Sequence, residues 1–547
     1  MAFKILKSIC VLLLASQALG AQALTGRISD GTNARPVAGA VVMLRDSSGY
    51  AITRTITNDS GHYRLRLAGR YVGVEVRRIG YRPTSRPVPA LNEDARLDIE
   101  LRPVATMLEA VRVADRSVCP ARRDRAQALA LWEQAKSALL ATVVSADVNP
   151  GAMRVLTYQR WLDARGVRIQ EQHVQIADQT AAASFAAAAG AQDFVEKGFI
   201  TTKAGRPQYH APDAHVLLDE RFTQGYCFAL TRSGSRPPEF LGLSFAPARR
   251  VRDVTGIEGT LWVDTLRRRL VDIEYRYATS DRSDRPKSGG FVSFHELRNG
   301  TSLIDRWGIR MVHAEQLRIV APPASARAAD RIIDAPNAPV SHMTEGGGEL
   351  ASVRWPDGHT WRAPLGALRS RVTDRGGRPM SHTKVRLKGT DYSATTDSSG
   401  VVDIRELLPG PYDVEIIDSA LATIDIPIAT AIRFEAERDV TFTEPLAASS
   451  AVDQVTKMCK DDGAWTTGSV LLIARVFGAD NQPVSGASWE LGDDRGAVGS
   501  DGVFVYCKGL ETGQRLKLLV HSGADAPQEH TVTISRQLNV ERVQLPK

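Results

Sequence analysis

The chain has 547 residues, of which 43% are hydrophobic and 24% are charged, and its formal net charge at pH 7 is +7. This length exceeds what one hydrophobic core supports, so about three to five domains are expected. The composition excludes an intrinsically disordered chain. The 69 basic and 62 acidic residues are spread along the chain, which argues against nucleic acid as a partner.

The N-terminus has the three parts of a secretory signal. Lys4 and Lys7 precede an apolar run at residues 9–14, and the small-residue sequence Ala21-Gln22-Ala23 follows. This order predicts a signal peptide over residues 1–23; a buried N-terminal strand is the alternative. The apolar run is too short to remain as a membrane span, so we expect a cleaved product without a transmembrane segment. It would be periplasmic, secreted or peripherally associated with the outer membrane.

One pattern occurs three times, at residues 24–103, 366–447 and 448–547. In each copy polar and apolar residues alternate, and Gly, Pro, Asn and Asp interrupt the runs. This period of two predicts short antiparallel strands packed as a two-layer β-sandwich. A pattern that returns three times is the signature of a repeated structural module.

Each copy also has an aspartate close to a glycine before a strand, at Asp59, Asp397 and Asp501. An Asp side chain can accept a hydrogen bond from the backbone that follows it, and Gly tolerates positive φ, so these sequences predict tight turns. Calcium ligation is the alternative. It is disfavoured because each Asp stands alone, whereas calcium takes about six to eight oxygen ligands.

Residues 104–320 show a different pattern. A helix is predicted at residues 122–142, with Leu129, Trp132, Ala135, Leu139 and Leu140 near one face. Strands are predicted after it, at 153–161, 167–176, 216–222, 227–231, 259–265, 270–277, 290–294 and 307–312. This order predicts a central α+β domain with a curved antiparallel sheet, within a chain that is mainly β.

Two stretches have weaker patterns. The alanine-rich residues 181–191 are interpreted as a short helix or a loop. Residues 321–365 are rich in Ala, Pro, Gly and polar residues, and this composition predicts a linker.

Four cysteines remain once Cys10 is removed with the signal: Cys119, Cys227, Cys459 and Cys507. An even number in an exported chain predicts disulfide bonds. Three pairings are possible, and we favour Cys119 with Cys227 and Cys459 with Cys507, because each pair falls within one predicted domain. Zinc is the competing interpretation, but no Cys-x-x-Cys sequence is present.

The histidines and serines do not form the motifs of known peptidases. Two zinc ligands at His-x-x-Glu spacing converge on one ion, yet no Glu follows three residues after His173, His210, His215, His295, His313 or His382. No His-Glu-x-x-His and no Gly-x-Ser-x-Gly sequence occurs. We therefore predict no catalytic residue, no metal and no cofactor, and a protein that is not an enzyme.

Two kinds of surface residue are candidates for ligand binding. Sugar rings stack on exposed aromatic side chains, and Trp489 and Tyr392 within the repeats are the candidates; burial in a sandwich core is the alternative for both. Short basic clusters occur at Arg249-Arg250 with Arg252, and at residues 267–269. These clusters predict solvated hairpins, with contact to anionic lipid as the alternative.

The repeated phrase resembles the carboxypeptidase regulatory-like domain, a prealbumin-like sandwich also found at the front of TonB-dependent receptors. The resemblance rests on the Pro-x-x-Gly-Ala step from Pro36 and again from Pro483, and on the Asp-x-x-Gly turn. Copy one has Asn58 where Asp is usual, and copy two lacks the Gly-Ala step after Pro379. The resemblance implies a carbohydrate-binding-like sandwich fold and an accessory role.

The central residues resemble the middle region of exported bacterial proteins that carry such a domain. The resembling sequences are Cys119, Leu131-Trp132, residues 226–228, 259–264, 289–294 and 307–311. Residues 259–264 and 270–277 are also similar to strands of lipoprotein-carrier-like half-barrels, which hold acyl chains against a curved sheet.

These observations predict a non-catalytic exported scaffold of the bacterial cell envelope that binds through its sandwiches. The partner would be an envelope protein or a glycan. The alternatives are a carbohydrate-binding accessory module and a carrier of lipid or another amphiphile that uses the central sheet.

The favoured cysteine pairing is testable by peptide mapping. Non-reducing digestion of the exported protein should release one peptide pair joined through Cys119 and Cys227 and another joined through Cys459 and Cys507. A link between Cys119 and Cys459 would contradict the predicted domain boundaries.

Overall fold

The computed structural model describes residues 22–89, 94–104, 122–181, 183–249, 251–279, 288–314, 317–319, 331–333, 339–460, 469–523 and 526–546. It divides into two compact units. The first comprises Met1–Ala152, Thr180–Ile309 and Arg354–His359, and the second comprises Met153–Gln179, Arg310–Val353 and Thr360–Lys547.

The first unit begins with a sandwich of two antiparallel layers. One layer has the order β4 (His62–Arg66), β1 (Ala23–Asp30) and β7 (Ala95–Arg96), and β8 (Ile99–Leu101) also pairs with β1. The other has the order β3 (Ala51–Ile56), β2 (Val41–Arg45), β5 (Gly73–Arg77) and β6 (Thr84–Pro87). Alternate residues of both layers form its apolar core.

The second unit contains two more sandwiches. In one, β26 (Val401–Leu407), β23 (Gly366–Thr373), β29 (Thr441–Phe442) and β30 (Leu446–Ala447) face β25 (Ser393–Thr395), β24 (Lys384–Leu387), β27 (Gly410–Ile417) and β28 (Ala429–Ala436). In the other, β34 (Val503–Tyr506), β31 (Leu471–Phe477) and β37 (Leu538–Gln544) face β33 (Asp494–Ala497), β32 (Ser488–Leu491), β35 (Arg515–His521) and β36 (Gln528–Thr533).

All three sandwiches have the same strand order. The first strand lies between an antiparallel neighbour and a parallel one, and the second strand lies between the third and the fifth. The prediction of a mainly β chain with three sandwiches is therefore confirmed.

The repeated turn explains why each copy needs a glycine. Gly61, Gly400 and Gly502 have φ of 75°, 77° and 80°, in the left-handed region that Gly adopts without strain. A Cβ on any of them would lie 2.5 to 2.8 Å from a carbonyl oxygen of the first strand. The glycine thus lets the turn lie against that strand.

The side chains of these turns differ from the prediction in the first copy. Asn58 Oδ1 accepts hydrogen bonds from the backbone of Ser60 and His62, and Asp397 Oδ1 accepts them from Ser399 and Val401. Asp59 accepts only from the Ser60 hydroxyl. Asn58, rather than Asp59, occupies the position from which a side chain reaches two residues ahead.

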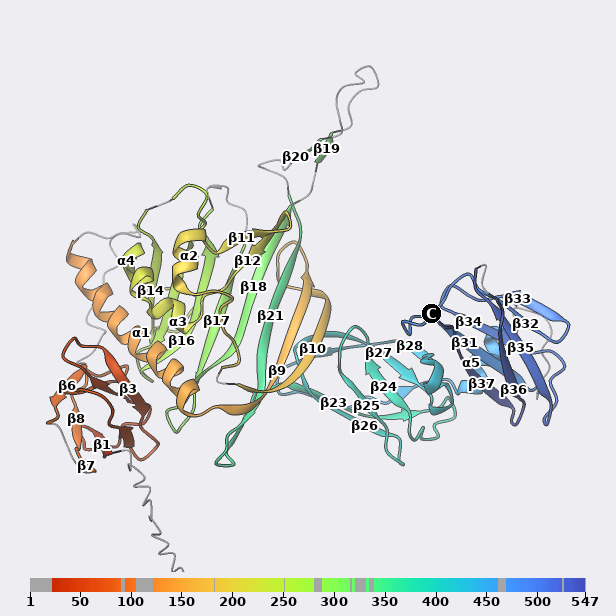
Figure 1. The fold of residues 1–547 in the computed structure, drawn as a ribbon, viewed down its shortest axis with the longest axis horizontal. Helices are drawn as coiled ribbons and strands as arrows, with labels where there is room; N and C mark the ends of the chain where they lie inside the picture. The colour runs from red at the N-terminus through yellow and green to blue at the C-terminus, as the bar shows by residue number, and fades with distance from the viewer. Residues whose placement is uncertain are drawn as a thin grey trace, which may run out of the picture. The chain divides into compact units, whose positions relative to one another are not determined.

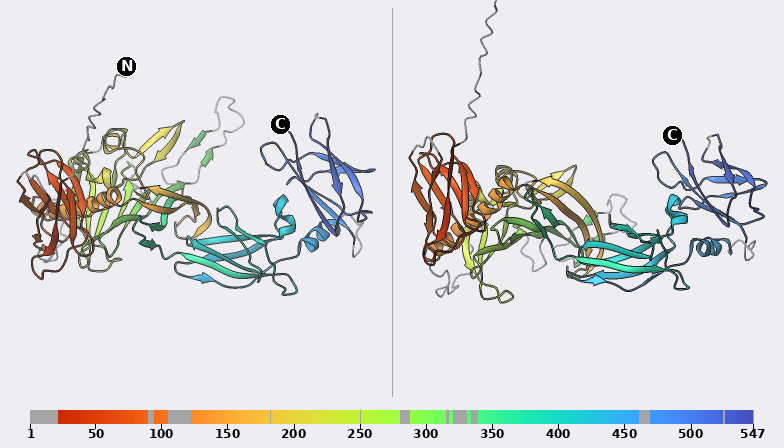
Figure 2. Two further views of the ribbon diagram at one scale, coloured as in Figure 1. Left: turned by 60° about the horizontal axis from the view of Figure 1, so that its bottom comes forward. Right: turned by 90° about the horizontal axis from the view of Figure 1, so that it is seen from below.

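The rest of the first unit is a helix packed on an antiparallel sheet (Figures 1 and 2). The sheet order is β18 (Ser302–Ala314), β17 (Gly289–Glu296), β16 (Arg269–Tyr277), β15 (Ile257–Asp264), β14 (Phe240–Pro247) and β13 (Tyr226–Thr231). Helix α1 (Arg122–Val148) crosses one face of it, with β11 (Ile200–Lys203) and β12 (Arg206–Tyr209) forming a separate hairpin.

Helix α1 fills the face of the sheet that it covers. Trp132 stacks on Phe228 of β13 with ring centroids 4.7 Å apart, and Leu131, Ala135 and Leu139 are buried in the same cluster. Leu129 is exposed, so its predicted place on the buried face is wrong; the neighbouring Ala128 is buried in its place. Helix α1 therefore covers the face of the sheet that a carrier of lipid or another amphiphile would have used to hold its ligand.

Three short helices complete this layer: α2 (Ala191–Lys197), α3 (Ala214–Leu218) and α4 (Glu220–Gly225). The strand predicted at 216–222 is therefore wrong. Asp213 and Asp219 each accept a hydrogen bond from the backbone two or three residues ahead and cap α3 and α4. These caps outweigh the strand preference of the short apolar run.

In the second unit the strand order β10 (Ile169–Ala181), β9 (Gly151–Leu162) and β21 (Val340–Arg354) forms a sheet, with β22 (Thr360–Arg362) beside β21. A short hairpin of β19 (Leu317–Ile319) and β20 (Arg331–Ile333) stands apart from it. The linker predicted at 321–365 is wrong over 340–354. Glycines at 346–348 suggested a loop, but apolar and acidic side chains on both sides of them are buried in the strand.

The apolar core of the second sandwich extends across a helix to the last sandwich, which also has an interior core of its own. Helix α5 (Ala451–Lys460) joins them, and Val455 and Cys459 pack against Leu471 and Leu538 of the last sandwich. Cys459 and Cys507 form a disulfide bond with a Cα–Cα distance of 6.1 Å. Cys119 lies outside the described residues, so its pairing with Cys227 stays a prediction.

No helix among the described residues is both long and apolar enough to cross a bilayer.

Removal of the Cys459–Cys507 bond tests how α5 is held. The bond closes a separation of 48 residues, so the paired substitution Cys459→Ala and Cys507→Ala should lower the free energy of unfolding of this sandwich by about 2–4 kcal/mol. Denaturant titration with and without reductant measures it. Reductant should destabilise the native protein more than the variant, which keeps the predicted Cys119–Cys227 pair; equal sensitivity would contradict the assignment.

Candidate functional site

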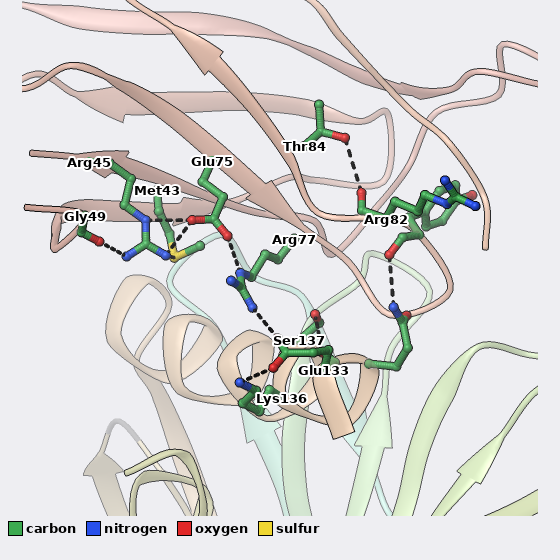
Figure 3. Close-up of polar contacts among 12 residues, drawn as sticks. Met43, Arg45, Gly49, Glu75, Arg77, Arg82, Thr84, Glu133, Lys136 and Ser137 are labelled. Atoms are coloured by element: carbon green, nitrogen blue, oxygen red, sulfur yellow. Dashed lines mark hydrogen bonds and ion pairs between the residues drawn. The ribbon is translucent and has the colours of Figure 1, made fainter. Parts of the chain in front are cut away.

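A chain of polar contacts joins the exposed tip of the first sandwich to helix α1 (Figure 3). It begins at the turn after β2, where Arg45 Nη1 donates to the Gly49 carbonyl at 2.7 Å. The same guanidinium donates through Nε to Glu75 at 2.9 Å. In the pairing of β2 with β5, Arg45 lies opposite Gly73. Glu75 is two residues further along β5, so its side chain is on the same face of the sheet as that of Arg45.

The chain continues from β5 to the helix. Arg77 contacts Glu75 on its own strand and donates through Nη1 to Glu133 of α1 at 3.2 Å. Glu133 also pairs with Lys136, one helical turn further on. Glu75 and Arg77 are largely buried, whereas Glu133 is partly exposed, so the network as a whole fixes orientation more than it adds stability.

A buried amide makes the second contact between the sandwich and α1. Gln134 Oε1 accepts from the Gly80 backbone N–H at 2.7 Å, and its Nε2 donates to the Tyr81 carbonyl at 3.2 Å. Both ends of the amide are satisfied, which buried side-chain amides require. Apolar contact accompanies it, because Val41 and Met43 pack on the helix.

An arginine connects the sandwich to the end of β17. Arg78 donates to both carboxylate oxygens of Glu296, with the longer bond at 3.2 Å. Both side chains are mostly buried. A two-bond arginine–carboxylate pair is directional, so it sets the angle at which the two elements meet.

Two glycines meet backbone to backbone at the same boundary. Gly39 and Gly300 have φ of 69° and 82°. A Cβ on Gly39 would lie 2.7 Å from the Gly300 carbonyl oxygen, and a Cβ on Gly300 would lie 2.1 Å from the Gly39 nitrogen. No residue with a side chain fits at either position without displacing backbone.

Asp30 and Tyr81 form a smaller polar cluster beside Arg268. The Tyr81 hydroxyl donates to Asp30 Oδ2 at 2.9 Å, and Arg268 lies 5.1 Å above the tyrosine ring. Burial alone would raise the pKa of Asp30, but hydrogen bonds from Thr32 and Tyr81 and the charge of Arg268 outweigh it and hold this pKa below its usual value. Asp30 therefore stays ionised, and keeps the hydrogen bonds it accepts, to a lower pH than an aspartate in water.

The structure does not support the residues that the sequence singled out for sugar binding. Trp489 is 9% exposed and stacks on Phe504 at 4.9 Å, and Tyr392 is 2% exposed with its hydroxyl donating to the Glu406 carbonyl. Neither ring offers a face to a ligand. Both lie on inward-facing strand or turn positions, where the alternating pattern buries an aromatic side chain.

One pair does have the His-x-x-Glu spacing: His342 and Glu345 of β21. Residues three apart on a strand point to opposite faces. Glu345 is buried against Tyr158 and Arg310, while His342 stacks on His313 at 4.5 Å, so the pair does not converge. Within the described part of the chain, no group of three or more His, Cys, Asp or Glu side chains is placed to hold a metal ion.

The residues that join the sandwich to α1 were missed by the sequence analysis. Arg77 and Glu133 are 56 positions apart, and Arg78 and Glu296 are 218 apart. No local pattern marks such pairs. Gly300 gave no hint either, because an Asn-Gly pair is what a hairpin turn ordinarily uses.

The glycine contact can be tested with a matched pair of substitutions. Gly39→Ala should lower the free energy of unfolding of the first unit by about 2–5 kcal/mol, because a left-handed backbone and an overlap with Gly300 are both penalised. Gly49 has φ of 82° with nothing within 4 Å of a new Cβ, so Gly49→Ala should lose only about 1–2 kcal/mol. Equal losses in denaturant titration would show that the close approach is unimportant.

Comparison with known proteins places the first sandwich in a family. Residues 23–102 match the model of the carboxypeptidase regulatory-like domain, whereas no curated protein matches the chain.

Solved structures that match this chain at low similarity include three bacterial proteins. The TIE protein of Bacillus anthracis is 10% identical, with 63% of this chain and 63% of that protein covered, at a TM-score of 0.15. The shaft pilin SpaA of Lactobacillus rhamnosus GG is 7% identical, with 33% of this chain and 96% of that protein covered, at a TM-score of 0.14. BcpA, the major pilin subunit of Bacillus cereus, is 10% identical, with 79% of this chain and 99% of that protein covered, at a TM-score of 0.14. Identities and scores this low carry no argument about function. The family assignment rests on the sequence model alone: the first sandwich of this chain is a carboxypeptidase regulatory-like domain, which spans residues 23–102.

Proposed function

We propose that this protein is a non-catalytic, exported scaffold that binds a protein of the cell envelope through the exposed tip of its first sandwich. The observation that carries the proposal is the Tyr50 side chain. It is 74% exposed, yet it stands on a turn that is tied to the helix of the central domain. We call Tyr50 and Val72 the tip surface.

The turn beneath Tyr50 is rigidly built. Asp46 Oδ1 accepts from the backbone of Ser48 and Tyr50, each at 2.9 Å, and the Asp46 N–H donates to the Tyr50 carbonyl. Arg45 holds the Gly49 carbonyl and continues into the network that reaches α1. A large aromatic side chain held in this way loses little conformational entropy on binding.

Val72 extends the same surface. It is 53% exposed, and its N–H donates to the Arg45 carbonyl, so it lies beside the end of β2 that leads into the Tyr50 turn. Tyrosine is enriched among the residues that dominate protein interfaces, and an adjacent aliphatic side chain adds apolar area. This chemistry favours a protein partner over a glycan.

Export is supported by two independent features. The N-terminal sequence has the parts of a secretory signal, and the bond between Cys459 and Cys507 is of a kind that persists in oxidising compartments. Strand β1 begins at Ala23, whose N–H donates to Asp94 at 2.8 Å. Cleavage after Ala23 would therefore remove the first residue of this strand.

Site-specific photo-crosslinking in the producing bacterium tests the tip surface. With p-benzoylphenylalanine at position 50 or 72, irradiation should yield one discrete adduct with an envelope protein. The matched control is position 167, since Val167 is 79% exposed in the second unit. Arg77→Ala should weaken the adduct from position 50, because it cuts the network that holds the turn.

Two outcomes would contradict the proposal. Positions 50 and 72 could yield no adduct while position 167 does, which would place the partner elsewhere. Alternatively, the chain could remain in the cytoplasm with residues 1–23 attached, as shown by fractionation and N-terminal sequencing, and it would then not be exported.

A further inference from the structure

The first unit contains an open cavity with a volume of about 1020 Å³, near the upper end of the range found for ligand pockets. It lies among α2, the end of α4 and the segment that follows β14. Its floor is made of aromatic rings in two stacked pairs, Phe194 with Phe199 at 4.4 Å and Phe222 with Tyr226 at 4.1 Å. The floor is apolar and closely packed.

One wall of the cavity is fastened to this floor. The Phe199 N–H donates to the Thr255 carbonyl at 2.7 Å. Gly198 has φ of 80°, and a Cβ there would lie 2.6 Å from the Thr255 nitrogen, so the glycine permits the approach. The wall then turns sharply at Asp253, whose φ is 63°, between Val251 and Val254, which bridge each other.

The mouth of the cavity combines exposed valines with cations. Val195 and Val251 line it and are 47% and 61% exposed, which is unusual for aliphatic side chains that line the same hollow. Arg249 and Arg252 line it as well. Asp253 is the one carboxylate among the lining residues, and it lies 3.9 Å from Arg252, so the mouth keeps a net positive charge.

We propose that this cavity binds a single-chain anionic amphiphile, with the acyl chain over the aromatic floor and a carboxylate or phosphate head group at Arg249 and Arg252. The apolar floor and valines would remove the chain from water, and the two guanidiniums suit a planar or tetrahedral anion. The covered face of the sheet beneath α1 is not used. The site does not involve the tip surface, so the two proposals fail independently.

Titration of the full exported chain with palmitate tests the site, with lysophosphatidic acid as the phosphate arm and hexadecyltrimethylammonium as a cation with the same chain length. Palmitate or lysophosphatidic acid should bind saturably at one site per chain, and the cation about tenfold or more weakly. Whichever anion binds more tightly identifies the head group. Val251→Asp and Arg252→Glu should each weaken the binding of that anion by about tenfold or more.

The controls use exposed residues away from the cavity. Val251 and Arg252 are themselves exposed, so their substitution leaves the packed floor intact. Val167→Asp and Arg536→Glu carry the same chemical changes on the second unit and should leave the affinity unchanged. The proposal is overturned if neither anion binds saturably, if the cation binds equally well, or if Val251→Asp and Val167→Asp have the same affinity. Binding of an apolar peptide without binding of either anion would also overturn it.

Discussion

A contact between two glycines underlies the architecture of the first unit. Gly39 and Gly300 bring backbone against backbone where any Cβ would overlap the partner's atoms, and both also have positive φ. This approach sets the distance between the first sandwich and the hairpin that follows β17. At that distance Arg78 reaches Glu296, and Gln134 reaches the backbone at Gly80. The directional polar contacts therefore depend on a steric one.

The same principle of assembly occurs in the second unit. Glu345 and Glu349 lie four residues apart on β21 and are buried. Arg310 contacts Glu345, and Arg438 from the turn after β28 donates to both oxygens of Glu349 at 2.7 Å. Buried ion pairs add little net stability because desolvation offsets their attraction, but they are costly to break and so fix geometry. Directional polar pairs thus join the first sandwich to the rest of its unit and the second sandwich to β21.

The errors in the sequence analysis have identifiable physical causes. Glycines at 346–348 indicate a loop, yet β21 runs through them because its backbone pairs with β9 and its side chains on either side are buried. Asp213 and Asp219 cap two short helices where an apolar run suggested a strand. Trp489 and Tyr392 offered the right chemistry for a sugar, but their alternating positions turn them inward. In the first two cases a contact with a distant element, or a cap, outweighed the local pattern, whereas the aromatic rings are buried by the alternation itself.

The sequence by itself determined what depends on neighbouring residues. Strand alternation and the glycine before the fourth strand specify a sandwich three times over, because a period of two and a left-handed turn are local properties of the chain. Only the tertiary structure decided which side chains meet: Arg77 with Glu133, the aromatic floor with the arginines at its rim, and the exposure of Tyr50. These depend on packing between segments far apart in sequence, and no local pattern records which surfaces remain uncovered once those segments have packed.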